Sequence, residues 1–372
     1  MPIAIPNQVA NQPLRQLPQP EPVPDMQTYV RERELCLALD ARKRDNYERY
    51  MAARRRSATV DYLPIKLDIE NVSRCNYRCI MCQVSEWPKG RRARDMTFEE
   101  FKKIIDEQYG LVEIKLQGMG EPMMGKGVFF EMIRYARSKH IWVRTVTNAS
   151  LLHIDENYRR VIDSDVNELQ ISIDGADEQT FEKIRPGSRF SMAVRNCKLI
   201  NDYCNGQSLV RTKMWTVVQR DNSHQLPVLV DLAADMGFKT MVFSLNLSDW
   251  GLMDWKQRND TINVEHVFGV DQAHALVARG ERLGVKVAFW NITSKYATDS
   301  PERLCPWPFE RAYVSSDMRV VPCCMIANPD SYEIGPMNEG FERVWKSREY
   351  QEFRRRHLQG DIPDICRGCY VL

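Results

Sequence analysis

The sequence lacks a long apolar run, and it lacks an excess of charge of either sign. No stretch approaches the roughly 20 apolar residues that a membrane-spanning helix needs. The N-terminus does not combine a charged start with an apolar segment, as a secretory signal would. Its 52 basic and 50 acidic side chains give a net charge of +2, so neither nucleic acid nor an anionic membrane is expected as a partner. A cytoplasmic protein is therefore expected.

Cysteine, by contrast, is plentiful, with eleven in the chain. Cytoplasmic thiols stay reduced, so these cysteines are not expected to form a disulfide framework. Metal binding or catalysis is the better expectation, and the spacing must decide. Three cysteines stand close together at 75–82, and five more lie within 304–372.

Composition and pattern divide the 372 residues into four parts. Residues 1–25 are rich in proline, asparagine and glutamine, which predicts a disordered or extended tail. Residues 26–59 predict a highly charged helix packed on the main domain. Residues 60–303 form the main domain, and the cysteine-rich stretch 304–372 predicts a second, small domain.

Short apolar strands alternate with helical segments from residue 65 onward. This alternation predicts a parallel sheet with helices on its outside, an α/β fold. Six such units predict a partial (β/α)6 barrel of the TIM type, with its chemistry at the C-terminal ends of the strands. The strands are expected at 65–69, 111–117, 141–147, 168–174, 209–218 and 239–245, and a further helix and strand follow near 271–283 and 285–289.

The first cysteine group has the spacing Cys75-x3-Cys79-x2-Cys82 and follows the first predicted strand on a loop. Three thiolates can bind three irons of a 4Fe–4S cube, whereas ferredoxin clusters use four cysteines. The next cysteine is Cys197, so one iron would stay open for a small molecule. A structural zinc site, the alternative, would need a fourth ligand at a typical spacing.

Three further motifs stand at the ends of predicted strands. Gly118-Met119-Gly120-Glu121-Pro122 follows the second strand, Thr147-Asn148 ends the third, and Ser172-Ile173-Asp174-Gly175 ends the fourth. Together with the cysteine spacing, they resemble the radical S-adenosylmethionine (SAM) superfamily over roughly residues 60–300. The pattern departs from the family at Ala149, where a glycine is usual, and at Met81, where an aromatic residue is common.

This resemblance implies that the open iron binds SAM and passes it one electron, which gives methionine and a 5′-deoxyadenosyl radical. It also implies that the backbone of the glycine-rich element receives the SAM amino group. Polar groups at the ends of the third and fourth strands would reach its ribose or carboxylate, and Arg211 and Lys213 on the fifth strand are weaker carboxylate candidates. The expected SAM contacts are Gly118, Gly120, Glu121, Asn148, Ser172, Asp174 and Arg211.

The second cysteine group resembles the SPASM/twitch extension of radical SAM enzymes. Twitch is the shorter form with one auxiliary 4Fe–4S cluster, and five cysteines are too few for two complete clusters. The implied ligands are Cys305, Cys323, Cys366 and Cys369. A zinc-ribbon-like site with the same four cysteines is the alternative. Cys324 is left as a buried thiol beside the cluster or as a hydrogen-atom donor, whereas Cys36, Cys197 and Cys204 are expected in the core.

A saturated auxiliary cluster can accept an electron from a substrate radical, which favours an oxidation. The cysteine spacing is most similar to that of the twitch-type 2-deoxy-scyllo-inosamine dehydrogenases. It predicts a radical SAM oxidoreductase that dehydrogenates an alcohol of a small, polar, sugar-like molecule and takes electrons from a reductant such as flavodoxin or ferredoxin.

Three alternatives stay open. An epimerase would quench the substrate radical with a thiol hydrogen from Cys324, Cys197 or Cys204. A peptide-modifying enzyme is disfavoured because residues before 60 do not resemble a winged-helix peptide-binding domain. A non-catalytic iron–sulfur electron carrier is disfavoured because it would not need the SAM motifs.

Overall fold

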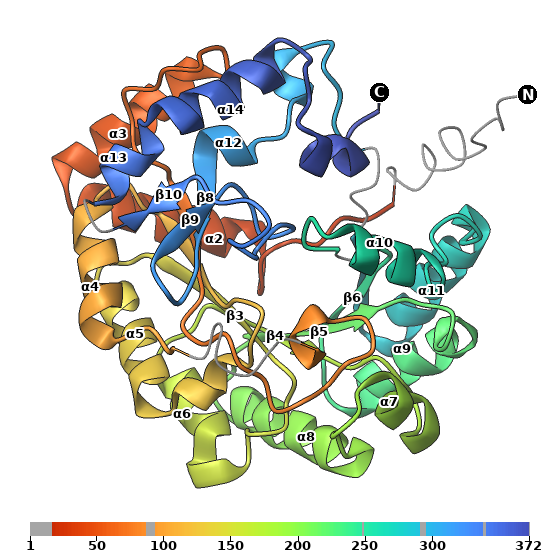
Figure 1. Ribbon diagram of the computed structural model, residues 1–372. Helices are drawn as coiled ribbons and strands as arrows, with labels where there is room; N and C mark the ends of the chain where they lie inside the picture. Colours follow the sequence, from red (N-terminus) through yellow and green to blue (C-terminus); the bar gives the residue numbers. More distant parts are fainter. Residues whose placement is uncertain (1–16, 87–93, 248, 291–294, 338–339, 372) are drawn as a thin grey trace, which may run out of the picture.

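Parallel strands in chain order form most of the sheet in the computed structural model, which describes residues 17–86, 94–247, 249–290, 295–337 and 340–371 (Figure 1). Each strand from β1 to β7 pairs in parallel with the next. The predicted partial barrel is confirmed, because the strand order runs from β10 at one edge to β7 at the other without closing. The strands are β1 (Lys66–Ile69), β2 (Glu113–Leu116), β3 (Trp142–Thr147), β4 (Glu168–Ser172), β5 (Thr212–Val217), β6 (Thr240–Ser244) and β7 (Lys286–Trp290).

Helices surround the outside of this sheet (Figure 1). In α4, Thr97 and Glu100 cap each other's backbone N–H groups, and Phe101, Ile104 and Ile105 are buried on one face. Apart from α10 (Met253–Asp260), none of whose residues belongs to this core, the helices cover the outward side of the strands with their apolar faces, which is where the core lies. The helices are α4 (Phe98–Glu107), α5 (Gly127–Arg137), α6 (Asn157–Asp163), α7 (Glu178–Ile184), α8 (Phe190–Gly206), α9 (Leu226–Asp235), α10 (Met253–Asp260) and α11 (Val270–Leu283).

The C-terminal region, where a second, small domain is predicted over 304–372, continues the sheet of the barrel. Its strand β8 (Arg311–Val314) pairs in parallel with β1, and β9 (Arg319–Val321) and β10 (Gly335–Pro336) continue the same sheet. A sheet edge leaves backbone N–H and C=O groups without partners, and β8 supplies those partners to β1. The rest of this region contains α12 (Trp307–Glu310), α13 (Phe341–Trp345) and α14 (Arg348–Leu358).

The N-terminal region covers the barrel end opposite the motif-bearing strand ends. Two helices, α2 (Met26–Ala38) and α3 (Ala41–Ala53), replace the single helix predicted over 26–59, because Asp40 caps the start of α3. The tail predicted over 1–25 is ordered from residue 17, where Leu17 and Val23 are buried. Residues 1–16 lie outside the described residues. The ordered part is held because Lys213 donates to the Glu21 carbonyl at 2.6 Å.

No helix in the described part of the chain combines the length and the apolar character that crossing a membrane would require.

Arg354 on α14 connects the C-terminal helices to the rest of the fold through hydrogen bonds and contacts with aromatic rings. It is fully buried and donates to the carbonyls of Pro308 (2.7 Å), Trp345 (2.9 Å) and Ala58 (3.4 Å). Its guanidinium also lies over the rings of Trp345 (4.2 Å) and Tyr350 (4.4 Å). Burial lowers its pKa to about 10, and the carbonyls and rings compensate for the lost hydration.

Arg354→Met should therefore lower the free energy of unfolding by about 3 kcal/mol, because it leaves buried carbonyls without donors. Urea unfolding of the reconstituted protein measures this change. The neighbouring Arg355 pairs with Glu352 at the surface, so Arg355→Met is the control and should change stability by less than about 0.5 kcal/mol. Equal unfolding midpoints for the two variants would contradict the role given to Arg354.

Candidate active site and cluster loops

The loop after β1 brings Cys75, Cys79 and Cys82 together. The charge of a Cys79 thiolate would raise the pKa of both Cys75 and Cys82, and that of Cys75 would raise the pKa of Cys82, so the three sulfurs lie within electrostatic reach of one another. Burial, followed by the charge of Glu121, raises the pKa of Cys75 to about 12. Binding to iron would have to displace these protons.

Segments from three neighbouring strand ends hold this loop. The Glu121 N–H donates to the Arg74 carbonyl at 3.0 Å, and the Arg78 N–H donates to the Pro186 carbonyl at 2.9 Å. Asn148 places its side-chain amide 3.8 Å from the Cys75 sulfur. The loop is therefore positioned by the segments after β2, β3 and β4, at the C-terminal ends of the strands.

Gly118 and Gly120 allow the loop after β2 to lie directly against the segment that leads to Cys75. A Cβ atom at Gly120 would overlap the carbonyl oxygens of Val72 and Arg74, and one at Gly118 would overlap the side chain of Glu70. Only glycine permits this approach. The loop thus keeps its backbone next to the cysteine group, where the SAM amino group is expected.

Gly120→Ala should separate the two segments and reduce iron and SAM binding, with a loss of stability of roughly 1–3 kcal/mol from overpacking. Iron content and the electron paramagnetic resonance spectrum of the reduced protein, with and without SAM, measure the effect. A Cβ atom at Gly206, at the end of α8, would meet no atom within 4 Å, so Gly206→Ala is the control. A Gly120→Ala protein with unchanged iron content and an unchanged SAM response would refute this role.

Glu121 ties the end of β2 to the end of β3. One carboxylate oxygen accepts from the Thr147 hydroxyl and the other from the Asn148 N–H, both at 2.8 Å. Burial raises its pKa to about 7. With both oxygens engaged, the side chain positions the loop while the loop's backbone faces the expected SAM site. Ala149, the residue after Asn148, has φ 66°. Residues other than glycine rarely adopt this backbone conformation, which explains why the radical SAM pattern has glycine at this position.

Asp174 forms a buried ion pair that no motif in the sequence indicates. Its carboxylate accepts from Arg185 at 2.6 and 2.8 Å and from the Val217 N–H at 2.8 Å. Arg185 also approaches the Cys79 sulfur at 3.9 Å. Asp174 is thus occupied by protein partners, which does not support a direct SAM contact, whereas Ser172 ends β4 at the same barrel end. No spacing or motif marks Arg185 among the 52 basic residues.

Arg185→Gln should lower the free energy of unfolding by about 3–5 kcal/mol, because it leaves the buried Asp174 carboxylate unpaired. It should also alter the spectrum of the reduced cluster, since the cation beside Cys79 is lost. Lys183, exposed and paired with Asp221 at 3.1 Å, gives the control variant Lys183→Gln. If both variants unfold at the same urea concentration and have the same cluster spectrum, Arg185 has no such role.

Arg211 and Lys213 do not lie at the site. Arg211 precedes β5 and pairs with Asp165 at 2.9 Å, and Lys213 pairs with Glu168 at 3.0 Å. Glu168 begins β4. Both cations therefore lie at the N-terminal ends of parallel strands, opposite the cysteine loop, and the structure does not support the SAM-carboxylate role expected for Arg211.

The four tail cysteines also converge. Cys305 precedes α12, Cys323 follows β9, and Cys366 and Cys369 lie on the 3-10 helix η8 (Asp364–Cys369). Each thiolate charge raises the pKa of others in this group, and burial raises that of Cys323 to about 12. The structure thus brings together the residues that were expected to hold an auxiliary cluster.

Both cysteine groups are suited to a 4Fe–4S cluster, because each supplies three or four thiols from neighbouring segments. A zinc ion would draw its ligands to about 2.3 Å from a single centre, whereas a 4Fe–4S cube holds each cysteine on a separate iron. Cys36, Cys197 and Cys204 are buried core thiols; the last two lie on α8, which covers the outside of the sheet, so neither faces the barrel interior.

Polar contacts join the two cluster regions. Asn328 donates to the Gln83 side chain at 3.2 Å, one residue after Cys82. Glu70 accepts from the Met119 N–H and the Ser316 N–H, each at 3.0 Å. Cys324 packs in the same small cluster as Met119 and Trp250. The C-terminal region is therefore fixed against the loop expected to bind SAM.

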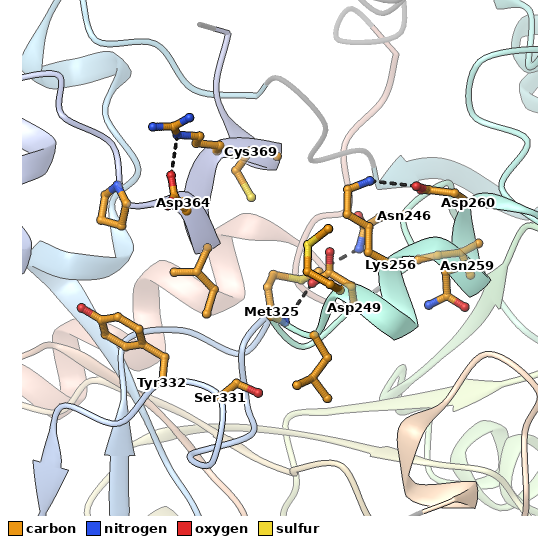
Figure 2. A pocket seen from close by; sticks show the side chains of 18 of the residues that line it. Asn246, Asp249, Lys256, Asn259, Asp260, Met325, Ser331, Tyr332, Asp364 and Cys369 are labelled. Carbon is orange, nitrogen blue, oxygen red and sulfur yellow. Dashed lines mark hydrogen bonds and ion pairs between the residues drawn. The ribbon is translucent and has the colours of Figure 1, made fainter.

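A cleft of about 940 Å³ opens beside the auxiliary cysteines (Figure 2). Lys256 and Asp260 on α10 and Asn246 form one wall. Tyr332 and Cys369 of the C-terminal region form the other, and Met325 lies beside Asn246, with its sulfur 3.9 Å from the Asn246 amide nitrogen. Described residues between β6 and α11 thus form one side of a cavity suited to a ligand.

Family models match both cysteine regions. The Radical SAM superfamily model matches residues 71–233, and the SPASM model, an iron–sulfur cluster-binding domain, matches 305–370. The chain is a radical SAM enzyme with a C-terminal SPASM domain. The radical SAM domain implies a 4Fe–4S cluster that binds SAM, and the SPASM domain implies auxiliary iron–sulfur binding in the tail. The twitch-type assignment, with a single auxiliary cluster, stays a prediction.

Similar proteins are known by sequence and by structure. A mycofactocin maturase, MftC, from Mycolicibacterium smegmatis is 28% identical over 319 residues, which cover 82% of this radical SAM chain and 77% of the relative. A PqqA peptide cyclase from Bradyrhizobium diazoefficiens is 22% identical over 311 residues, which cover 82% of this chain and 79% of the relative. The structure of Streptococcus suis SuiB bound to S-adenosylmethionine shares the fold, with a TM-score of 0.62, 15% identity and coverage of 83% and 72%.

Proposed function

We propose that this radical SAM enzyme modifies a peptide. The observation that carries the proposal is that relatives aligned over four-fifths of the chain are a maturase and a peptide cyclase. SuiB, which shares the fold, has also been solved with its precursor peptide SuiA. These relatives favour the peptide-modifying alternative over the dehydrogenation of a small, sugar-like alcohol that the cysteine spacing suggested.

The cleft supports a peptide substrate. Its volume of about 940 Å³ lies at the upper end of the range for ligand sites. Its walls combine charged side chains such as Lys256 and Asp260 with the apolar Leu252 and Ile365. An extended peptide needs both kinds of contact, since its backbone is polar and its side chains vary.

Separate groups of residues have separate roles in the proposed reaction. Cys75, Cys79 and Cys82 would hold the cluster, and the backbone at 118–121 would orient SAM. When bound, the cluster and SAM supply a 5′-deoxyadenosyl radical that abstracts hydrogen from the substrate. The four tail cysteines would hold the auxiliary centre beside the cleft, where it can take an electron from the substrate. A flavodoxin or ferredoxin in the cytoplasm would provide the electron that starts the reaction.

The test is anaerobic reconstitution with iron, sulfide, dithionite and SAM, followed by addition of short peptides encoded beside the gene. We expect 5′-deoxyadenosine and a change in the mass of one peptide, both followed by liquid chromatography and mass spectrometry. Deuterium at the reacting carbon of that peptide should appear in 5′-deoxyadenosine. A variant with Cys75, Cys79 and Cys82 all replaced by alanine is the control and should give neither product.

Two results would count against the proposal. Absence of 5′-deoxyadenosine from a protein with intact clusters would exclude radical chemistry. Formation of 5′-deoxyadenosine with every peptide unchanged, together with oxidation of a cyclic polyol, would favour the alcohol dehydrogenase instead.

A further inference from the structure

The inward-facing residues of β8, β1 and β2 form two rows across the barrel. The outward residues of these strands, such as Leu67 and Ile114, belong to the apolar core under the helices, so the alternate residues face inward. The strand register sets the rows: Arg311, Lys66 and Glu113 form the lower row, and Tyr313, Asp68 and Lys115 form the upper row.

Every charged group of the lower row has an oppositely charged partner, since Lys66 also pairs with Glu310 at 3.6 Å, and the row is closed from below. Glu113 pairs with Lys66 at 3.7 Å, with Arg311 at 3.2 Å and with Arg144. The Tyr29 hydroxyl on α2 donates to the same carboxylate at 2.8 Å. This row therefore forms a closed base and offers no free charge to a ligand.

The upper row contains an unmatched cation. In the described part of the chain, Lys115 has no carboxylate within ion-pair distance, whereas Lys66, Arg144, Arg311 and Lys213 each have one. Burial lowers the pKa of Lys115. Lys115 is half-buried, and a charge that is largely shielded from water normally has a paired anion, so Lys115 lacks the partner that its position calls for.

Asp68, next to Lys115 in the same row, has spare hydrogen-bonding capacity. It is 1% exposed, and its Oδ1 accepts no hydrogen bond from the described residues. Arg311 approaches this oxygen only to 3.8 Å. Burial raises the pKa of the carboxyl group. This oxygen can therefore accept a hydrogen bond from a group that enters the barrel.

These groups lie between the two expected cluster regions and the cleft. Lys115 stands three residues before Gly118 on the same strand and loop. The Cys324 thiol is within electrostatic reach of both Lys115 and Asp68. The next residue, Met325, lines the cleft. Cys324 thus lies between the cleft-lining Met325 and the row that contains Lys115, beside the loop expected to bind SAM.

We propose that Lys115 binds a carboxylate of the substrate inside the barrel. The proposal rests on the proposed function, because in a peptide that carboxylate is the C-terminus or an acidic side chain. A carboxylate would give the ammonium its missing counter-ion through a short, charge-assisted hydrogen bond. The Oδ1 of Asp68, in the same row, can accept an N–H from the same part of the substrate. Lys115 and Asp68 would thereby determine which residue of the substrate peptide faces the reacting centre.

The first test measures carbamylation of individual lysines by cyanate in the reconstituted enzyme, by peptide mass spectrometry. Sodium butyrate is the probe, and butyramide is its uncharged control. Butyrate at ten times its dissociation constant should slow the labelling of Lys115 by roughly tenfold, and butyramide should not. Lys102, exposed on α4 and paired with Asp106, is the internal control and should react at the same rate throughout.

Equal effects of butyrate and butyramide would overturn the proposal, and so would failure of Lys115 to react after Lys102 is fully labelled. Neither outcome depends on peptide turnover. Protection by butyrate without modification of any peptide would leave the carboxylate site standing and remove the proposed function. Peptide modification without protection of Lys115 by butyrate would support the proposed function and refute the carboxylate site.

A second test compares Lys115→Met with Lys213→Met. Lys213→Met leaves the buried Glu168 unpaired, so its urea unfolding midpoint should fall. Lys115→Met removes an unmatched cation, so its midpoint should stay the same or rise. It should also abolish the difference between butyrate and butyramide as inhibitors of SAM cleavage. Equal destabilisation by the two substitutions would show that Lys115 has a structural partner and would refute the proposal.

Discussion

The parallel pairing of β8 with β1 is the constraint on which the rest of the site depends. It places the segment that carries Cys323 next to the strand that leads to Cys75. Glu70, one residue after β1, reinforces the pairing because its carboxylate binds the backbone on both sides, at Met119 and at Ser316. The two cysteine groups are consequently parts of one rigid frame, and the space between them is set by backbone hydrogen bonds. A fixed separation is what electron transfer between two centres requires.

Charge inside the barrel is ordered by depth. Near the N-terminal ends of the strands, ion pairs such as Lys213–Glu168 are complete and covered by the N-terminal segment. Near the C-terminal ends, Glu121 and Asp174 use their carboxylates to position neighbouring loops. On β1 and β2, the barrel interior also contains the unmatched ammonium of Lys115 and the Oδ1 of Asp68 without a donor in the described chain. A low-dielectric interior tolerates such groups poorly, which makes this part of the barrel the natural place for a charged ligand.

The sequence predicted the parts of the site that depend on local spacing. The cysteine pattern at 75–82, the glycines at 118 and 120 and the strand alternation each act over a few residues, and the structure places them as expected. Contacts between distant segments were not predictable in this way. Nothing near Arg185 reveals Asp174 as its partner, and the position of Arg211 depends on which end of β5 it occupies. The pairing of β8 with β1 likewise joins residues some 240 positions apart, which no local pattern encodes.

The position of β8 has a consequence for biosynthesis. Translation completes β1 early, but its hydrogen-bonding partner emerges only near the end of the chain. Until then the nascent barrel has an exposed strand edge, the kind of surface through which chains associate wrongly. Folding of the metal-binding tail and protection of that edge are therefore a single event. Completion of the N-terminal half is therefore not enough to protect the barrel from aggregation, because β8 must also be synthesised and paired.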